Sequence, residues 1–413
     1  MIGSINALAA ARPLSVPLRI GTRRFWLWGL VCGVFGAAVS SNSHSFAYSD
    51  FPQFWAAGRT VGTANLLDPT LHGAWEAANG VTPTFFPYTP GAAWLFAPFG
   101  WLSITAGFWV HAAVMTVLVG VAGFLTGRAL GLQGRVGLVA AYAWGPCMFA
   151  VAFGQNAPLA LLLVAVAIEG LRRDSDTLAG VGVGLLLYKP TLAIPLLVLL
   201  LLRRRWRALG LVAVVAAAWY FASVAATAGD WLWPIHLLSA LGAYYGPDTS
   251  YNAIRAISIP GLLVGNGAPP FIAWGLAAAV VVAAIPRLLR SSIVEAAAGV
   301  CLVGLAVSPH SLNYEAALAL PVILWTLGGI GTGIREPART WLIVVNCVAG
   351  MLILVGLWLG VSIMGVAVMA MTFIWISGWQ RLEVGSGTPS ADESTDRAVQ
   401  RRRPRSILAA RAR

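Results

Sequence analysis

The residues of this chain that can carry chemistry are few, because only 10% of its 413 residues are charged. Lys189 is the only lysine, and Asp50 is the first carboxylate along the chain. A carboxylate can accept a proton as a general base, and a cation can stabilise the negative charge of a phosphate. The sequence therefore contains residue types that a group-transfer reaction needs, namely a carboxylate that can act as general base and a cation that can bind an anion.

Lys189 lies in Tyr188-Lys189-Pro190, between the apolar runs 178–188 and 191–202. Because Pro190 interrupts helical hydrogen bonding, we expect two short half-helices here. Non-helical backbone at membrane depth is tolerated only where it is buried in protein or lines a cavity, which indicates a binding site. An ionisable residue at such a place is a functional candidate. The alternative is a side chain that extends to the membrane surface.

Asp50 lies in AYSDFPQFWAAG and has two interpretations. It can cap a helix that starts at Phe51-Pro52, or it can be the general base. We expect the nearby Asp68 and Glu76 to be solvated loop residues. Two histidines, His72 and His236, are expected to be interfacial residues, because no metal-ligand spacing surrounds them. No metal and no cofactor is therefore predicted.

The composition identifies the elements that must position these residues. The hydrophobic fraction is 58%, whereas a soluble domain carries about 25% charged residues. This excludes a soluble domain, a disordered chain and a nucleic-acid binder. The cysteines lie in apolar runs without CxxC spacing, and no Walker, GxGxxG, GxSxG or HExxH motif is present. We predict an all-α integral membrane protein, a polytopic helical bundle with about 10–13 transmembrane segments.

The arginines order these segments, because basic residues mark cytoplasmic loops. A first apolar segment, 25–41, is followed by a long first extracytoplasmic loop, 42–90; a cleavable signal peptide is the alternative reading of the first segment. The next span is expected at 104–127. Between basic loops the chain must then leave and return in pairs, which are 136–153 and 156–171, 178–188 and 191–202, 208–228 and 271–286, 292–308 and 312–330, 340–358 and 361–377. In this scheme every arginine except Arg59 and Arg255 faces the cytoplasm.

The predicted organisation has three parts. Residues 1–24 form a cytoplasmic segment, residues 25–380 the membrane domain with outer loops 42–90 and 229–270, and residues 381–413 a basic cytoplasmic tail. The net charge of +12 then reflects topology and attraction to anionic lipid. We expect a bacterial-type plasma membrane location, with the site on the extracytoplasmic side.

Outward-facing polar residues gather in short motifs on that side. They are Gln155 in GQNAP, which can also be a simple outer turn, Asn252 and Arg255 in the second outer loop, and His310 and Glu315 in SPHSLNYE. Aromatic residues, among them Tyr88 in FFPYTP, can stack on the faces of sugars.

The ordered motifs FFPYTPGAAWLFAPF, GQN, YKPTLAIP with RRRWR, and SPHSLNYEAALALP resemble those of glycosyltransferase family 87. These are polyprenol-phosphate-dependent, mannosyltransferase-like membrane enzymes of the GT-C fold. The resemblance implies an inverting transfer of a mannose-like hexose from a polyprenyl-phosphate sugar donor to a lipid or glycan acceptor. A transporter or lipid flippase and a non-enzymatic assembly protein are the alternatives, although no internal repeat supports a transporter.

The resemblance also implies residue roles. Asp50 matches the proposed catalytic base, Gln155 and Lys189 match the GQ and KP motifs, and Asn252 and Arg255 match polar residues of the long outer loop.

The segment after SP departs from the family pattern. Tyr314 and Glu315 stand where family members often carry a basic or histidine-containing pair, and the histidine, His310, comes earlier. We expect Lys189, Arg255 and His310 to stabilise the leaving phosphate.

Overall fold

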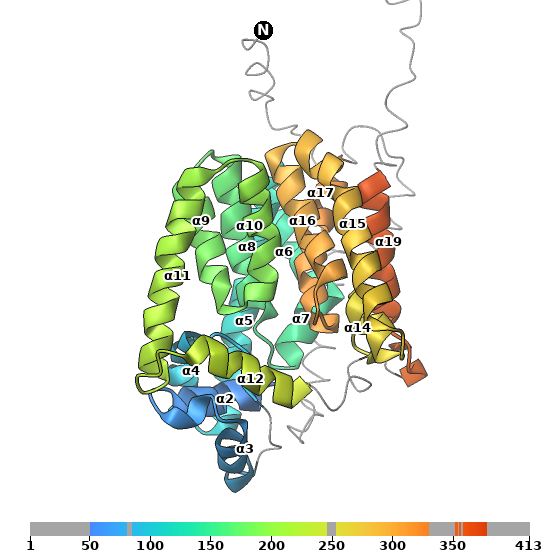
Figure 1. Ribbon diagram of the computed structural model, residues 1–413. Coiled ribbons are helices and arrows are strands. Elements are labelled where there is room, and N and C mark those ends of the chain that lie inside the picture. The colour runs from blue at the N-terminus through green and yellow to red at the C-terminus, as the bar shows by residue number, and fades with distance from the viewer. Residues whose placement is uncertain are drawn as a thin grey trace, which may run out of the picture. The chain divides into compact units, whose positions relative to one another are not determined.

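The computed structural model describes residues 50–80, 85–245, 253–329 and 352–377, the last without residues 354 and 357. Within these ranges the chain is helical, and its only β-type pairing is an isolated antiparallel bridge between Ala256 and Leu312. The predicted all-α class is confirmed (Figure 1). The first apolar segment and the basic tail lie outside the described residues.

Three described helices are long and apolar enough to cross a membrane. They are α5 (Ile104–Ala129), α11 (Trp206–Ala226) and α15 (Pro270–Arg290). A fourth span is possible from α6 (Gly134–Ala143) and α7 (Gly145–Ala152), which meet at 62°. Pro146 in the first turn of α7 explains the break, because proline cannot continue the hydrogen bonds of the preceding helix. The predicted polytopic membrane protein is thus confirmed.

Shorter helices stand beside the long ones in Figure 1. They are α8 (Ala157–Arg172), α9 (Asp176–Leu185) with η5 (Leu186–Tyr188), α10 (Pro190–Leu202), α16 (Ile293–Val307), α17 (Leu320–Gly329) after η6 (Asn313–Ala319), and α19 (Ile363–Ser377). Several of these are apolar but shorter than a full span. Most of the predicted segment 340–358 lies outside the described residues.

The predicted break at Pro190 is present. The helical turn η5 ends at Tyr188, Lys189 has non-helical angles (φ −131°, ψ 84°), and α10 begins at Pro190. The chain turns back at this point, because Arg205 after α10 lies 3.4 Å from Asp176 at the start of α9. Two half-helices therefore enter from one end of the bundle and place Lys189 at the other.

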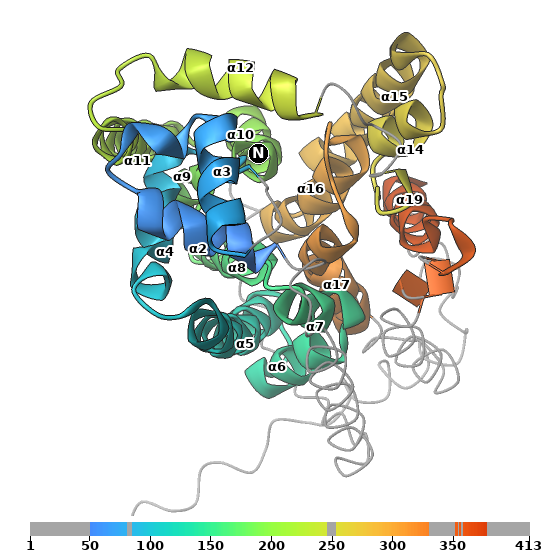
Figure 2. The same cartoon turned by 90° about the horizontal axis from the view of Figure 1, so that it is seen from below.

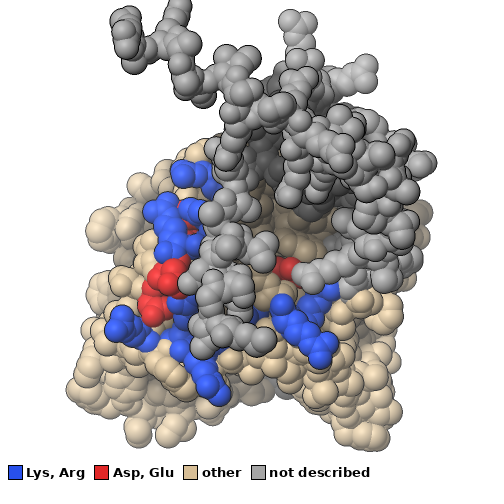
Figure 3. Space-filling model, turned by 90° about the horizontal axis from the view of Figure 1, so that it is seen from above, with Lys and Arg blue, Asp and Glu red and all other residues tan. Residues whose placement is uncertain are grey.

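Basic side chains gather on one face of the protein, at the end where α8 and α10 finish (Figure 3). Arg172 and Arg173 there bind Glu169 at 2.7 and 2.6 Å. Arg203 donates hydrogen bonds to the carbonyl oxygens of Leu288 and Ser291, which tie α10 to the end of α15. This grouping agrees with the loop assignment made from the arginines.

Short helices cover the opposite end of the bundle, which Figure 2 views directly. They are α2 (Phe51–Thr60), η3 (Ala64–Leu66), α3 (Pro69–Ala78), η4 (Pro90–Ala92), α4 (Ala93–Gly100), α12 (Trp233–Tyr245) and α14 (Ile259–Gly265). Helix α2 packs closely on α4 at Gly58, where a Cβ would lie only 2.4 Å from the Phe96 carbonyl oxygen. A rigid aromatic layer therefore lies next to the residue that precedes α2, Asp50.

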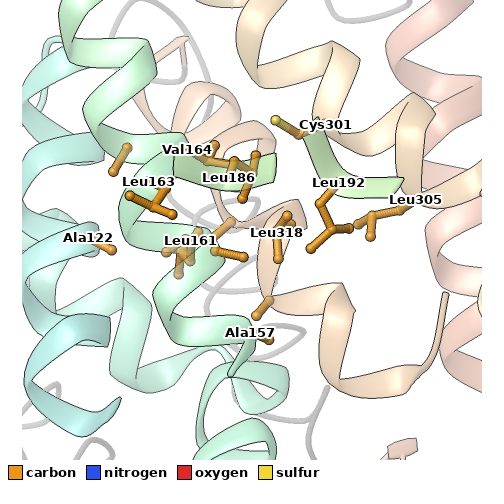
Figure 4. Packing of buried hydrophobic residues seen from close by; sticks show 14 of the residues in the cluster. Ala122, Ala157, Leu161, Leu163, Val164, Leu186, Leu192, Cys301, Leu305 and Leu318 are labelled. Carbon is orange, nitrogen blue, oxygen red and sulfur yellow. The ribbon is translucent and has the colours of Figure 1, made fainter. Parts of the chain in front are cut away.

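One buried apolar cluster joins the half-helices to the rest of the bundle (Figure 4). Leu161 of α8, Leu186 of η5 and Leu192 of α10 are almost fully buried in it. Small residues allow close helix contact elsewhere, as where a Cβ on Gly137 of α6 would lie 2.1 Å from the Gly123 carbonyl oxygen of α5. This packing fixes Gln155 and Lys189, which lie at the ends of these helices.

Candidate functional site

Asp50 does not cap the helix that follows it, since its side chain makes no hydrogen bond to the first turn of α2. Instead, its carboxylate accepts a hydrogen bond from Gln155 Nε2, and its backbone N–H donates to the Phe153 carbonyl at 3.1 Å. The capping interpretation of Asp50 is therefore wrong. It is Asp68 that caps a helix, by accepting from the N–H groups of Thr70 and Leu71 at 2.9 and 3.0 Å.

The GQNAP segment both turns the chain and supplies polar groups. Gly154 has φ +63°, a left-handed conformation that suits glycine, and reverses the chain between α7 and α8. Gln155 then points to Asp50, as described above. The next residue, Asn156, accepts hydrogen bonds from the Tyr188 hydroxyl at its backbone oxygen (3.2 Å) and at Oδ1 (3.4 Å). The turn thus links Asp50 to the break before Pro190.

Lys189 forms an ion pair with Glu315 inside the protein. The side chain of Lys189 is 12% exposed and that of Glu315 is fully buried, so Lys189 does not extend to the membrane surface. Its ammonium nitrogen lies 5.3 Å from the ring centre of Tyr88 and 5.7 Å from that of Tyr314, distances at which cations attract aromatic faces. Glu315 is itself held by the N–H of Leu312, at 3.2 Å.

The segment that carries Arg255 is held from two sides. Its backbone pairs with the start of η6 and with the loop before it, through Asn313 N–H to the Arg255 carbonyl and Ile257 N–H to the Ser311 carbonyl, both at 2.9 Å. From the residue just before α19, the Ser362 hydroxyl donates to the carbonyl of Ala256. The position of Arg255 therefore depends on segments far apart in the sequence.

The charges of these groups act on Asp50. Burial raises the pKa of Asp50 above its ordinary value of 3.8. The hydrogen bond from Gln155 opposes this shift, and the positive charges of Arg255 and Lys189 oppose it further. Asp50 thus lies within electrostatic reach of both cations.

His310 and Tyr88 belong to the same centre. Burial lowers the pKa of His310; the Glu315 carboxylate acts against this shift, and Lys189 adds to it. Burial raises the pKa of Tyr88 well above 10, and the charges of Asp50 and Glu315 raise it further. The pKa values of Tyr88 and His310 therefore both depend on the charge of Glu315.

The structure brings together the predicted site residues that it describes. They are Asp50, Tyr88, Gln155, Lys189, Arg255, His310 and Glu315. The remaining predicted residue, Asn252, lies outside the described residues. Sequence reasoning missed Tyr188, which is fully buried, stacks on Tyr88 with ring centres 6.2 Å apart and binds Asn156. The sequence feature that could have identified Tyr188 as a site residue is its position next to Lys189 in the YKP motif.

The first outer loop differs from expectation at two residues. Glu76 and His72 are fully buried on α3, with His72 Nε2 3.8 Å from Glu76 Oε1, so the prediction of a solvated Glu76 is wrong. Burial lowers the pKa of His72 to about 4. Helix α3 packs against α2, where Trp75 lies on Trp55 with ring centres 5.3 Å apart. In the second outer loop, His236 is exposed, and its Nδ1 lies 2.7 Å from Asp230 Oδ2.

The fold and the site define a polytopic membrane protein with two carboxylates, Asp50 and Glu315, and two cations at one end of its helical bundle. The sequence matches the model of glycosyltransferase family 87 over residues 85–309, more than half of the chain. The chain belongs to glycosyltransferase family 87, and it is a membrane glycosyltransferase that acts on a sugar donor and an acceptor. No curated protein matches the sequence. Family membership decides against the transporter and assembly-protein alternatives.

Proposed function

We propose that the protein transfers a mannose-like hexose from a polyprenyl-phosphate sugar to a lipid or glycan acceptor, on the extracytoplasmic face of a bacterial-type plasma membrane. The observation that carries the proposal is the position of Asp50, which binds Gln155 within electrostatic reach of Lys189 and Arg255. A base beside two cations is what an acceptor hydroxyl and a phosphate leaving group require.

In the proposed reaction Asp50 accepts the proton of an acceptor hydroxyl as its oxygen attacks the anomeric carbon. The bond between that carbon and the phosphate oxygen breaks, and its electron pair stays on the phosphate. One negative charge thus moves from Asp50 to the phosphate, where Lys189 and Arg255 stabilise it. A single displacement of this kind inverts the anomeric configuration. No acid is needed, because phosphate leaves as an anion.

Gln155 positions the base in this proposal. Its amide binds the Asp50 carboxylate, while the Asp50 N–H binds the Phe153 carbonyl of the same turn. A carboxylate held at both backbone and side chain loses little freedom when the acceptor arrives, as an oriented catalytic group requires.

Aromatic residues exclude water from the proposed site. Tyr88 lies 5.4 Å from Phe54 and 5.1 Å from Phe86 between ring centres, and all three are buried. Such a layer offers apolar faces to a sugar ring. It also shields Asp50 partly from water, and this desolvation raises the pKa of Asp50, which makes the carboxylate a stronger base.

The raised pKa of Asp50 predicts the pH dependence of transfer. The base must be deprotonated, so kcat/KM is expected to fall as the pH falls through this pKa, above the range of an ordinary aspartate. Arg255 lowers the pKa of Asp50, so the variant Arg255→Gln should move the acid limb to higher pH. Rates measured against pH for both proteins check this; a limb that stays in place or moves to lower pH argues against Asp50 as the titrating base.

The proposed location predicts the side of the membrane on which each end of the bundle lies. An alkaline phosphatase fusion at residue 70 should be active outside the cell, and a fluorescent fusion after residue 385 should fluoresce inside it. The reason is the sorting of basic residues to the other end of the helices. A cytoplasmic reporter at residue 70 would contradict the proposed side.

The proposed reaction is tested in membranes that contain the overproduced protein. Radiolabelled polyprenyl-phosphate mannose should yield labelled lipid or glycan in these membranes, above the level in membranes without the protein. If the label stays on the donor whichever endogenous acceptors are present, the proposed donor is wrong.

A further inference from the structure

Several buried polar atoms around the site have no hydrogen-bond partner among the described residues. They are Gln155 Oε1, Asn156 Nδ2, Ser311 Oγ and Asn313 Oδ1. Their side chains are at most 4% exposed. Buried polar atoms of folded proteins are almost always hydrogen-bonded, so a group of unpartnered ones calls for an explanation.

These atoms belong to two segments that both build the site. The first is the start of α8, where Gln155 binds Asp50 and Asn156 binds Tyr188, the neighbour of Lys189. Helix α8 packs against η6, which begins within the second segment, at Asn313.

The second segment contains Ser311 and Asn313. Their backbones pair with Ile257 and with Arg255, as described above. The residue between them, Leu312, donates its N–H to Glu315, the partner of Lys189. The side chains of Gln155 and Asn156 are thus hydrogen-bonded to Asp50 and to the neighbour of Lys189. Ser311 and Asn313 flank the residue whose N–H binds Glu315.

The donors and acceptors of this group indicate the chemistry of a ligand. The free atoms of Gln155 and Asn313 are acceptors, that of Asn156 is a donor, and the Ser311 hydroxyl is both. Hydroxyl groups of a sugar can satisfy all of them, because each hydroxyl donates and accepts. A bare phosphate has no proton for two carboxamide oxygens, and a lipid tail has no polar atom at all.

We propose that Asn156, Ser311 and Asn313 bind the hydroxyl groups of the transferred hexose, beside the cations that hold its phosphate. This inference rests on the proposed function and names the residues that distinguish one hexose from another. Without ligand, these side chains keep buried polar atoms unpaired, which destabilises the fold. Binding and stability should therefore respond in opposite directions when they are removed.

The test compares Ser311→Ala and Asn313→Leu with the wild-type enzyme. Each variant removes an unpartnered polar atom, so Tm without donor should stay the same or rise. The KM for polyprenyl-phosphate mannose should rise by about threefold to tenfold in each, the worth of one hydrogen bond. The preference for this donor over polyprenyl-phosphate glucose, its epimer at one hydroxyl, should shrink.

The matched control is Ser258→Ala. Ser258 is also fully buried, but its hydroxyl accepts from the Gly261 N–H at 3.2 Å and caps α14. Its loss should lower Tm and leave the KM near the wild-type value.

Two outcomes overturn the inference in distinguishable ways. If the wild-type protein transfers sugar but Ser311→Ala and Asn313→Leu lower Tm with unchanged KM and donor preference, these residues are structural and this inference alone fails. If the wild-type protein transfers neither sugar from a polyprenyl-phosphate donor, the proposed function fails and the inference fails with it.

Discussion

The variant Asp50→Asn is expected to lower kcat/KM for sugar transfer by roughly 10²–10⁴-fold, the usual contribution of a general base. The amide oxygen of Asn can still accept the hydrogen bond of Gln155, so the geometry around residue 50 is kept. Only the charge that takes up the proton is lost. Because desolvation raises the pKa of Asp50, the fold does not favour its charged form, so removal of the charge should not lower Tm.

The variant Asp68→Asn provides the matched control for this experiment. Asp68 caps α3 in the same outer segment, and Asn caps helices almost as well as Asp. Activity and Tm of this variant should both stay near the wild-type values. Near-normal transfer by Asp50→Asn would show that Asp50 is not the base.

Removal of Lys189 is expected to have two separable effects. In Lys189→Met, the buried Glu315 loses its cation, and breaking a buried ion pair from one side typically costs about 3–5 kcal/mol. The variant should therefore lose stability as well as donor affinity. A double variant, Lys189→Met with Glu315→Gln, removes both charges, and the new amide oxygen can still accept from the Leu312 N–H.

We expect the double variant to regain most of the Tm but to bind the polyprenyl-phosphate donor about 10- to 100-fold more weakly than the wild type. The loss reflects one charge-assisted hydrogen bond to the phosphate. Thermal unfolding and donor binding to the purified proteins separate the two effects. Wild-type donor affinity in the double variant would show that Lys189 only neutralises Glu315.

The membrane setting made the helical arrangement predictable. A proline between two apolar runs interrupts helical hydrogen bonding, and a bilayer tolerates such a break in few arrangements. The break at Lys189 was therefore predictable from Pro190 and from the arginines before α9 and after α10. The residues of the candidate site were predictable as a group, since polar residues at the ends of the helices are scarce in such a chain. The number of full spans was harder, because several of the described helices are shorter than a bilayer.

Long-range contacts account for what local patterns did not reveal. The sequence Asp-Phe-Pro fits a helix cap as well as a catalytic base, and only the contact of Asp50 with Gln155, 105 residues away, rules out the cap. The partner of Lys189 was likewise hidden, because Glu315 resembles any polar residue at the start of a helix. The prediction of a solvated Glu76 rested on the polar sequence around it, whereas Glu76 is fully buried on α3.

Sugar transfer by the purified protein in liposomes tests the central claim most directly. The protein would be given an acceptor lipid extract and one of two radiolabelled donors, polyprenyl-phosphate mannose or a nucleotide mannose, and the label in the product would be measured. Our account predicts transfer from the polyprenyl-phosphate donor, with its anomeric configuration inverted, and none from the nucleotide donor. Transfer from the nucleotide donor alone, or retention of configuration, would contradict it.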